Sequence, residues 1–122
     1  MPILDVEIVG DLPEPAQNGL ARRLADAAGE VLRSRPQGTW VKVRFLEEHA
    51  YAENAGGPDA GVSPVFVRVL KRGLTSGEAL KSEIEALTKA IAAACGRATE
   101  NVHIIYEPPG AGRVAFGGQL VE

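Results

Sequence analysis

The sequence predicts an α+β fold in which two βαβ repeats form a four-stranded mixed sheet, with two helices on one face and a short C-terminal hairpin. Three observations predict it. Strand-like alternation of apolar residues and helix-like spacing follow each other twice along the chain. The two copies correspond at offsets of about 60 residues, so Leu24 corresponds to Ile84 and Pro2 to Pro64. The pair Gly117-Gly118 near the end is typical of a hairpin turn.

The repeats also set the expected domain organisation. We expect a single domain over residues 1–122, with repeat one at 2–47, a connecting loop at 48–63 and repeat two at 64–122. A chain of 122 residues is long enough for one domain with a core. Because βαβ crossovers are right-handed, both helices can cover the same face of the sheet.

The elements of the first repeat follow from periodicity. Residues 3–9 alternate, with Leu4, Val6 and Ile8 facing one way and Asp5 and Glu7 the other, which predicts a strand. Apolar residues spaced by three and four predict an amphipathic helix over 16–33, with Asp11 as a candidate cap. The turn at 35–38 ends this helix, and residues 40–46 alternate as a second strand.

The second repeat has the same order after an aperiodic connection at 47–62, which we interpret as a loop. Residues 64–70 predict a strand. A helix follows, capped by Thr75 or Ser76 and ended by Gly96. Residues 102–107 predict a fourth strand, and 113–121 a short terminal hairpin.

One face of the predicted sheet carries both acids and bases. Its members are Asp5, Glu7, Lys42, Arg44, Arg68 and His103. Two interpretations stay open: a polar face in contact with solvent, or a face that meets other subunits with acids and bases pairing across the interface.

Bulk properties exclude several classes of function. The net charge is −3 with no basic stripe, so we expect no nucleic acid partner. The histidines His49 and His103 are far apart and no CxxC occurs, so we expect no metal. The one cysteine, Cys95, is expected as a small core residue. No apolar run approaches the roughly 20 residues of a membrane span, and no apolar signal core is present, so we expect a cytoplasmic protein without a membrane partner.

The Met1-Pro2 start is a candidate catalytic feature. If Met1 is removed, Pro2 becomes a secondary amine at the first residue of a strand. A free α-amino group has a pKa of about 8. Partial burial lowers the pKa of an amine and gives a base suited to neutral pH. The alternative is that Pro2 merely follows the start codon.

Pro2 at the head of a strand, two βαβ repeats, the run Phe66 to Arg72 and the ending Val102 to Leu120 together resemble the tautomerase superfamily. This superfamily includes 4-oxalocrotonate tautomerase, macrophage migration inhibitory factor and cis-3-chloroacrylic acid dehalogenase. The resemblance implies a homotrimer with active sites between neighbouring subunits, no cofactor, no metal, and small carboxylate substrates such as 2-oxo acids, their enols or unsaturated acids.

The resemblance also implies roles for individual residues. Pro2 matches the catalytic proline, Arg72 a carboxylate-binding arginine of the dehalogenase, and His103 a position that binds substrate in the tautomerase. The residues implied to bind substrate are Arg35, Lys42, Val114 and Phe116. The chain departs from the pattern at residues 10–12, where 4-oxalocrotonate tautomerase has a binding arginine.

The expected function is therefore a cofactor-independent isomerase, a keto-enol tautomerase in which the N-terminal proline acts as base and acid. The dehalogenase's water-activating acid has no convincing counterpart, although Glu107 and Glu122 are available. The alternatives are a dehalogenase or hydratase of 3-substituted acrylates, and a non-enzymatic ligand-binding module with the same fold.

Overall fold

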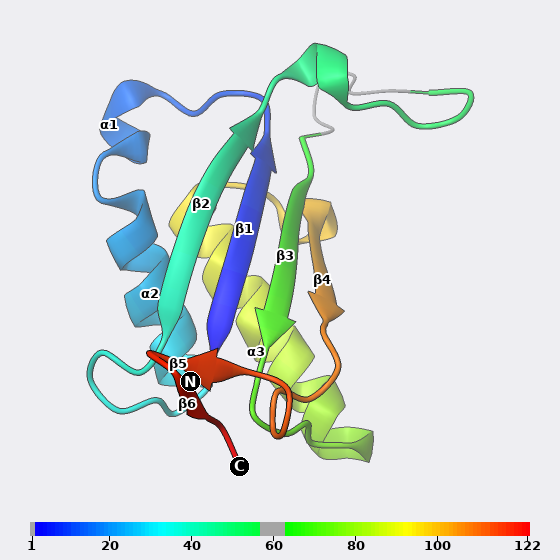
Figure 1. Cartoon of the computed structure of the whole chain (residues 1–122). Helices are drawn as coiled ribbons and strands as arrows, with labels where there is room; N and C mark the ends of the chain where they lie inside the picture. Colours follow the sequence, from blue (N-terminus) through cyan, green and yellow to red (C-terminus); the bar gives the residue numbers. More distant parts are fainter. Residues whose placement is uncertain (1, 57–62) are drawn as a thin grey trace.

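A four-stranded mixed sheet organises the protein (Figure 1). The structure, a computed structural model, describes residues 2–56 and 63–122. The strands are β1 (Ile3–Val9), β2 (Trp40–Leu46), β3 (Val65–Leu70) and β4 (Val102–Tyr106), in the order β2-β1-β3-β4. β1 is parallel to β2, β3 is parallel to β4, and β1 is antiparallel to β3. Each repeat therefore supplies one parallel pair, which confirms the predicted sheet.

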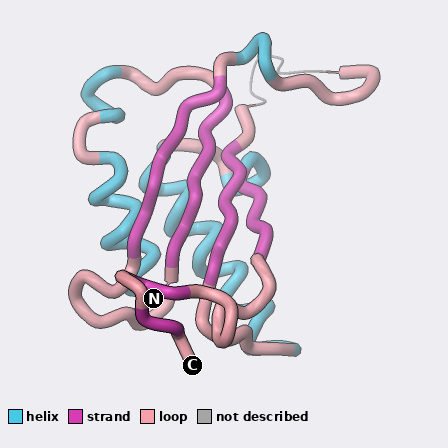
Figure 2. Tube along the Cα trace, in the orientation of Figure 1, coloured by secondary structure: helices cyan, strands magenta, loops and turns pink. Residues whose placement is uncertain are grey.

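Two long helices lie on one face of this sheet (Figures 1 and 2). They are α2 (Leu20–Val31) and α3 (Gly77–Cys95), and each connects the two strands of one parallel pair. α3 ends at Gly96, whose φ of +66° lies in the left-handed region that glycine adopts without strain. This C-terminal stop agrees with the sequence prediction.

The core lies between the sheet and the two helices. Strand residues of period two and helix residues at spacings of three and four meet there, because these are the positions that face inward. Cys95 is among them and 2% exposed, as expected for a small core residue. The largest fully buried side chains of this core are Leu4, Ile8, Leu24, Leu87 and Ile91.

The predicted single helix over 16–33 is wrong in its first part. The structure has a short helix α1 (Glu14–Gln17) and a break before α2. Gly19 has a φ of +71° and stands at the N-terminal end of α2, so the chain turns there at a residue that has no Cβ. Asp11 does not cap this region, because the residue before α1 is Pro13.

The remaining segments carry little regular structure. The connection between the repeats contains a 3₁₀ turn, η1 (Glu48–Ala50), and an isolated bridge between Glu53 and Gly56, while the rest of the predicted loop at 57–62 lies outside the described residues. The predicted hairpin is present as β5 (Ala115–Phe116) and β6 (Gln119–Leu120). A second 3₁₀ turn, η2 (Thr99–Asn101), leads into β4. Among the described residues, no helix combines the length and apolar character that a membrane crossing needs.

The core arrangement gives a direct stability prediction. Leu87 is fully buried in α3, whereas Leu74 is 39% exposed. We expect Leu87→Ala to lower the free energy of unfolding by about 2–5 kcal/mol, since it removes buried methyl groups and leaves a cavity. Chemical denaturation followed by circular dichroism measures it. The matched control Leu74→Ala should change stability far less, and equal losses would contradict this core.

Candidate active site

The start of β1 lies at a crowded edge of the sheet, the edge formed by the ends of the strands and not by an outer strand. β1 and β2 begin at this edge, β3 and β4 end there, and the hairpin β5–β6 lies across it (Figure 1). Pro2 directly precedes β1 and is half-buried. Its carbonyl accepts a hydrogen bond from the backbone N–H of Trp40 at 3.0 Å. This bond holds Pro2 against the first residue of β2.

A hollow of about 320 Å³, whose lining includes Ile3, the residue after Pro2, opens on the face of the sheet that the helices leave uncovered. This volume is at the small end of the range of roughly 300–1,000 Å³ that is typical of ligand sites. Among residues 2–56 and 63–122, no three His, Cys, Asp or Glu side chains come together as a metal site. The hollow is lined by Ile3, Asp5, Lys42, Arg68, Leu70, Glu107, Arg113 and Val114.

Charged side chains on this open face pair within the chain. The closest contact joins Lys42 Nζ to Asp5 Oδ1 at 3.0 Å, and these two residues are in register across β1 and β2. Arg68 donates to Glu107 Oε1 at 3.1 Å. A longer contact of 3.9 Å joins Arg44 to Glu7. Neutralising these charges therefore does not require a second subunit.

The hairpin supplies an aromatic contact next to Pro2. The ring of Phe116 meets that of Trp40 edge-on, with centroids 5.0 Å apart. Trp40 is 51% exposed, and its Nε1–H donates to the carbonyl of Gln37 at 3.0 Å. Val114 lines the hollow itself. Val114 and Phe116, which the resemblance implies to bind substrate, thus both lie at this edge, and Trp40, which was not predicted from the sequence, lies there with them.

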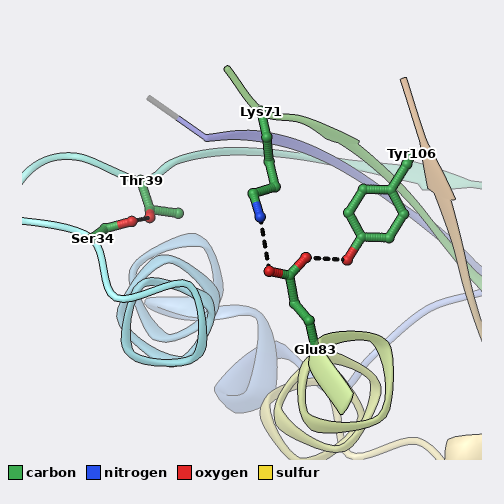
Figure 3. Close-up of polar contacts among 5 residues, drawn as sticks. All are labelled: Ser34, Thr39, Lys71, Glu83 and Tyr106. Atoms are coloured by element: carbon green, nitrogen blue, oxygen red, sulfur yellow. Dashed lines mark hydrogen bonds and ion pairs between the residues drawn. The ribbon is translucent and has the colours of Figure 1, made fainter. Parts of the chain in front are cut away.

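Arg72 and Arg35 lie near this edge but outside the hollow. Arg72 is exposed, and its Nε donates to the backbone carbonyl of Glu122. Arg35 is also exposed and lies in the turn between α2 and β2, where its carbonyl accepts from the N–H of Gly38. A hydrogen bond between the hydroxyls of Ser34 and Thr39 closes this turn (Figure 3).

His103 lies elsewhere on the same face. It is exposed on β4, opposite Phe66, and their ring centroids are 5.5 Å apart. Phe66 is in turn opposite Glu7 of β1, five positions beyond Pro2. At roughly 3.3 Å per residue, His103 lies about 17 Å along the sheet from Pro2 of its own chain. The structure brings Lys42 to the hollow beside Pro2 but does not bring His103 there.

A half-buried polar cluster supports this edge from the helix side (Figure 3). Glu83 of α3 accepts from Lys71 Nζ at 2.8 Å and from the hydroxyl of Tyr106 at 2.6 Å. Lys71 follows Leu70, the partner of Ile3, so the cluster ties the ends of β3 and β4 to α3 next to Pro2. Burial, and then the hydrogen bond and charge of Glu83, raise the pKa of Tyr106 above its usual 10.0.

The chain is similar to known proteins in structure rather than in sequence. No protein-family model matches the chain, and no curated protein matches it in sequence. A fused 4-OT, described as a symmetric trimer, superposes with a TM-score of 0.79 at 16% identity, covering 98% of this chain and 94% of its own. The expected fold is confirmed. The chain shares its fold with the fused 4-OT, as its resemblance to the tautomerase superfamily implied.

Two further structures support this assignment. Pt0534 inactivated by 2-oxo-3-pentynoate gives a TM-score of 0.77 at 17% identity, with 97% of this chain and 95% of the other covered. A macrophage migration inhibitory factor-like protein from Entamoeba histolytica gives 0.71 at 14% identity, with 98% and 97% covered. In all three cases the shared fold spans nearly the whole chain.

The raised pKa of Tyr106 predicts a pH dependence of stability. The folded state holds the phenolic proton more tightly than the unfolded state, which releases it above pH 10. Above pH 10 unfolding releases this proton. The contribution of Tyr106 to the free energy of unfolding is therefore fully present below pH 10 and decreases as the pH rises further. Tyr106→Phe should lose about 1 kcal/mol at neutral pH and show a weaker decline above pH 10. Urea titrations across this range measure both, and parallel pH profiles for variant and wild type would contradict the assignment.

Proposed function

We propose that this protein is a cofactor-independent tautomerase that moves a proton within small 2-oxo acids or their enols. The observation that carries the proposal is the place of Pro2. It is half-buried at the head of a central strand, its carbonyl accepts a hydrogen bond from Trp40, and the next residue, Ile3, lines a hollow of small-molecule size. The tautomerase fold shared with fused 4-OT supports it.

The mechanism uses one group as base and acid. Once Met1 is removed, the Pro2 nitrogen is a neutral secondary amine that takes the proton from an enol hydroxyl. The O–H electron pair forms the carbonyl as the double bond shifts, and the carbon at its far end takes a proton back from the charged Pro2. Three cationic and two anionic side chains line the hollow, and this net positive charge favours the neutral amine, because like charge disfavours protonation. The cycle consumes no cofactor, since one proton leaves and one returns.

The proposal also covers the residues that hold the substrate. The resemblance implies Arg72 as a carboxylate-binding arginine, a role suited to a planar bidentate donor, but Arg72 lies outside the hollow and its Nε already donates to Glu122. Arg35 and Lys42, the latter paired with Asp5, are proposed to contact the substrate at the same edge, and Val114 and Phe116 to provide an apolar wall.

We further propose a homotrimer in which the open faces of the sheets meet. Fused 4-OT structures similar to this chain are described as trimers. Ile105 on the open face of β4 is 42% exposed, which suits a buried place in an assembly. In such a trimer His103 of one subunit would serve the site of another. Light scattering coupled to gel filtration should give three times the 12.9 kDa chain mass, and a monomer would refute this part.

The catalytic role of Pro2 predicts a large effect of Pro2→Ala. We expect wild type to ketonise phenylenolpyruvate and the variant to lose roughly 10²-fold or more in kcat/KM, as for other general acid–base groups. Loss of the enol absorbance follows the reaction, and mass spectrometry of the same samples checks that Met1 is absent. Equal rates for the two proteins, or no turnover by wild type without Met1, would favour a ligand-binding module.

A second candidate has a specific observation in its favour. The carboxylates of Asp5 and Glu107 line the hollow, where an acid could activate water for hydration or dehalogenation of a 3-substituted acrylate. If this is the reaction, wild type should release chloride from 3-chloroacrylate, and Glu107→Gln should reduce this release by roughly 10²-fold. A chloride assay measures it. No chloride release by wild type would leave tautomerisation as the proposed reaction.

A further inference from the structure

We propose that Arg113 is the residue that binds the substrate carboxylate in the hollow beside Pro2, and that the site takes acids with a single carboxylate. Arg113 was not among the residues predicted from the sequence. The inference deepens the proposed tautomerase function and rests on it for the identity of the substrate.

The charges of the hollow lead to this residue. Three cationic and two anionic side chains line it, which is a net charge of +1. Lys42 is paired with Asp5, and Arg68 with Glu107. Within the described part of the chain, Arg113 has no carboxylate partner and contacts only backbone carbonyls. One bound carboxylate would neutralise the surplus charge.

Arg113 is held in place with part of its guanidinium unused. Its Nη1 donates to the carbonyls of Pro108 and Pro109 at 3.1 and 3.0 Å. Its backbone N–H donates to the carbonyl of Gly110 at 2.9 Å, which fixes the turn. Among the described residues, Nε and Nη2 meet no acceptor, so the edge of the fork that they form is available for two parallel bonds to a carboxylate.

The rest of the hollow sets the kind of acid that fits. Ile3, Leu70 and Val114 are its apolar members, and Ile3 is the residue next to Pro2. A carboxylate on Arg113 would place the remainder of a short acid over these side chains and toward Pro2. Binding a second carboxylate would require breaking an existing ion pair, since Lys42 and Arg68 are already neutralised. The site therefore favours a monocarboxylate.

Arg72 is the alternative, and its position differs. It is not among the residues that line the hollow, and its Nε is already used by the carbonyl of Glu122. Arg113 belongs to the same edge but faces the hollow beside Ile3. Arg72 follows the end of β3, whereas Arg113 lies in the turn before the hairpin. Substitutions can therefore test the two arginines independently.

The direct test measures binding without catalysis. Benzoate, which cannot tautomerise, is titrated into ¹⁵N-labelled wild type and followed by ¹H–¹⁵N chemical shifts, with benzamide as the uncharged control. We expect saturable binding of benzoate that weakens with salt, much weaker binding of benzamide, and a Kd raised about 10-fold or more in Arg113→Gln. Arg113→Lys should fall between, because an ammonium keeps the charge without the fork. Arg22→Gln, on the exposed surface of α2, is the matched control and should bind as wild type does.

The outcomes separate this inference from the proposed function. If wild type fails to ketonise phenylenolpyruvate but binds benzoate through Arg113, the tautomerase proposal fails and the carboxylate site stands. If Arg113→Gln binds benzoate as tightly as Arg22→Gln does, or if only Arg72→Gln loses binding, the inference is overturned. Absence of benzoate binding to wild type also overturns it. Circular dichroism of each variant confirms that it is folded, and in an active enzyme Arg113→Gln should raise KM more than it lowers kcat.

Discussion

The antiparallel pairing of β1 with β3 is the constraint on which the rest of the structure depends. It joins two repeats that are each complete parallel units, and it places Ile3 opposite Leu70. The head of the first repeat and the end of β3 therefore share one edge of the sheet, with Pro2 just before β1 and Lys71 just beyond β3. A shift of one residue in this register would turn every core side chain of β1 to the open face, so the buried face fixes it firmly.

The two faces of the sheet have different roles. One face is buried by α2 and α3, and its alternating valines and leucines supply the burial that stabilises the domain. The other face carries charges that pair across neighbouring strands at the ends nearest Pro2. Because these pairs are exposed, each contributes little to stability, at most about 1 kcal/mol. Their effect is electrostatic. The two pairs neutralise four of the five charged side chains that line the hollow, and Arg113 is the fifth.

Sequence reasoning succeeded where burial imposes a period. The four strands and the helix α3 were predicted because inward-facing residues recur at two or at three to four positions. The break at Gly19 was missed because the apolar spacing continues through it. The distance of His103 from Pro2 could not be predicted for another reason: it depends on the register of β3 against β1, which no single strand encodes. Glu83 and Tyr106 are 23 positions apart, and only the packing of α3 on the sheet brings them together.

Arg113 illustrates the same limit at the site itself. It lies in an aperiodic turn between β4 and the hairpin, where neither hydrophobic period nor residue propensity predicts which way its side chain points. The turn is positioned by backbone bonds to the end of β3, from Gly110 N–H to the carbonyl of Lys71 at 2.7 Å and from Ala111 N–H to that of Arg72 at 3.1 Å. These bonds use main-chain atoms, so many sequences can make them. The same turn leads into the segment that carries Val114 and Phe116, and side chains on it can therefore change which acid is bound without disturbing the strand that holds Pro2.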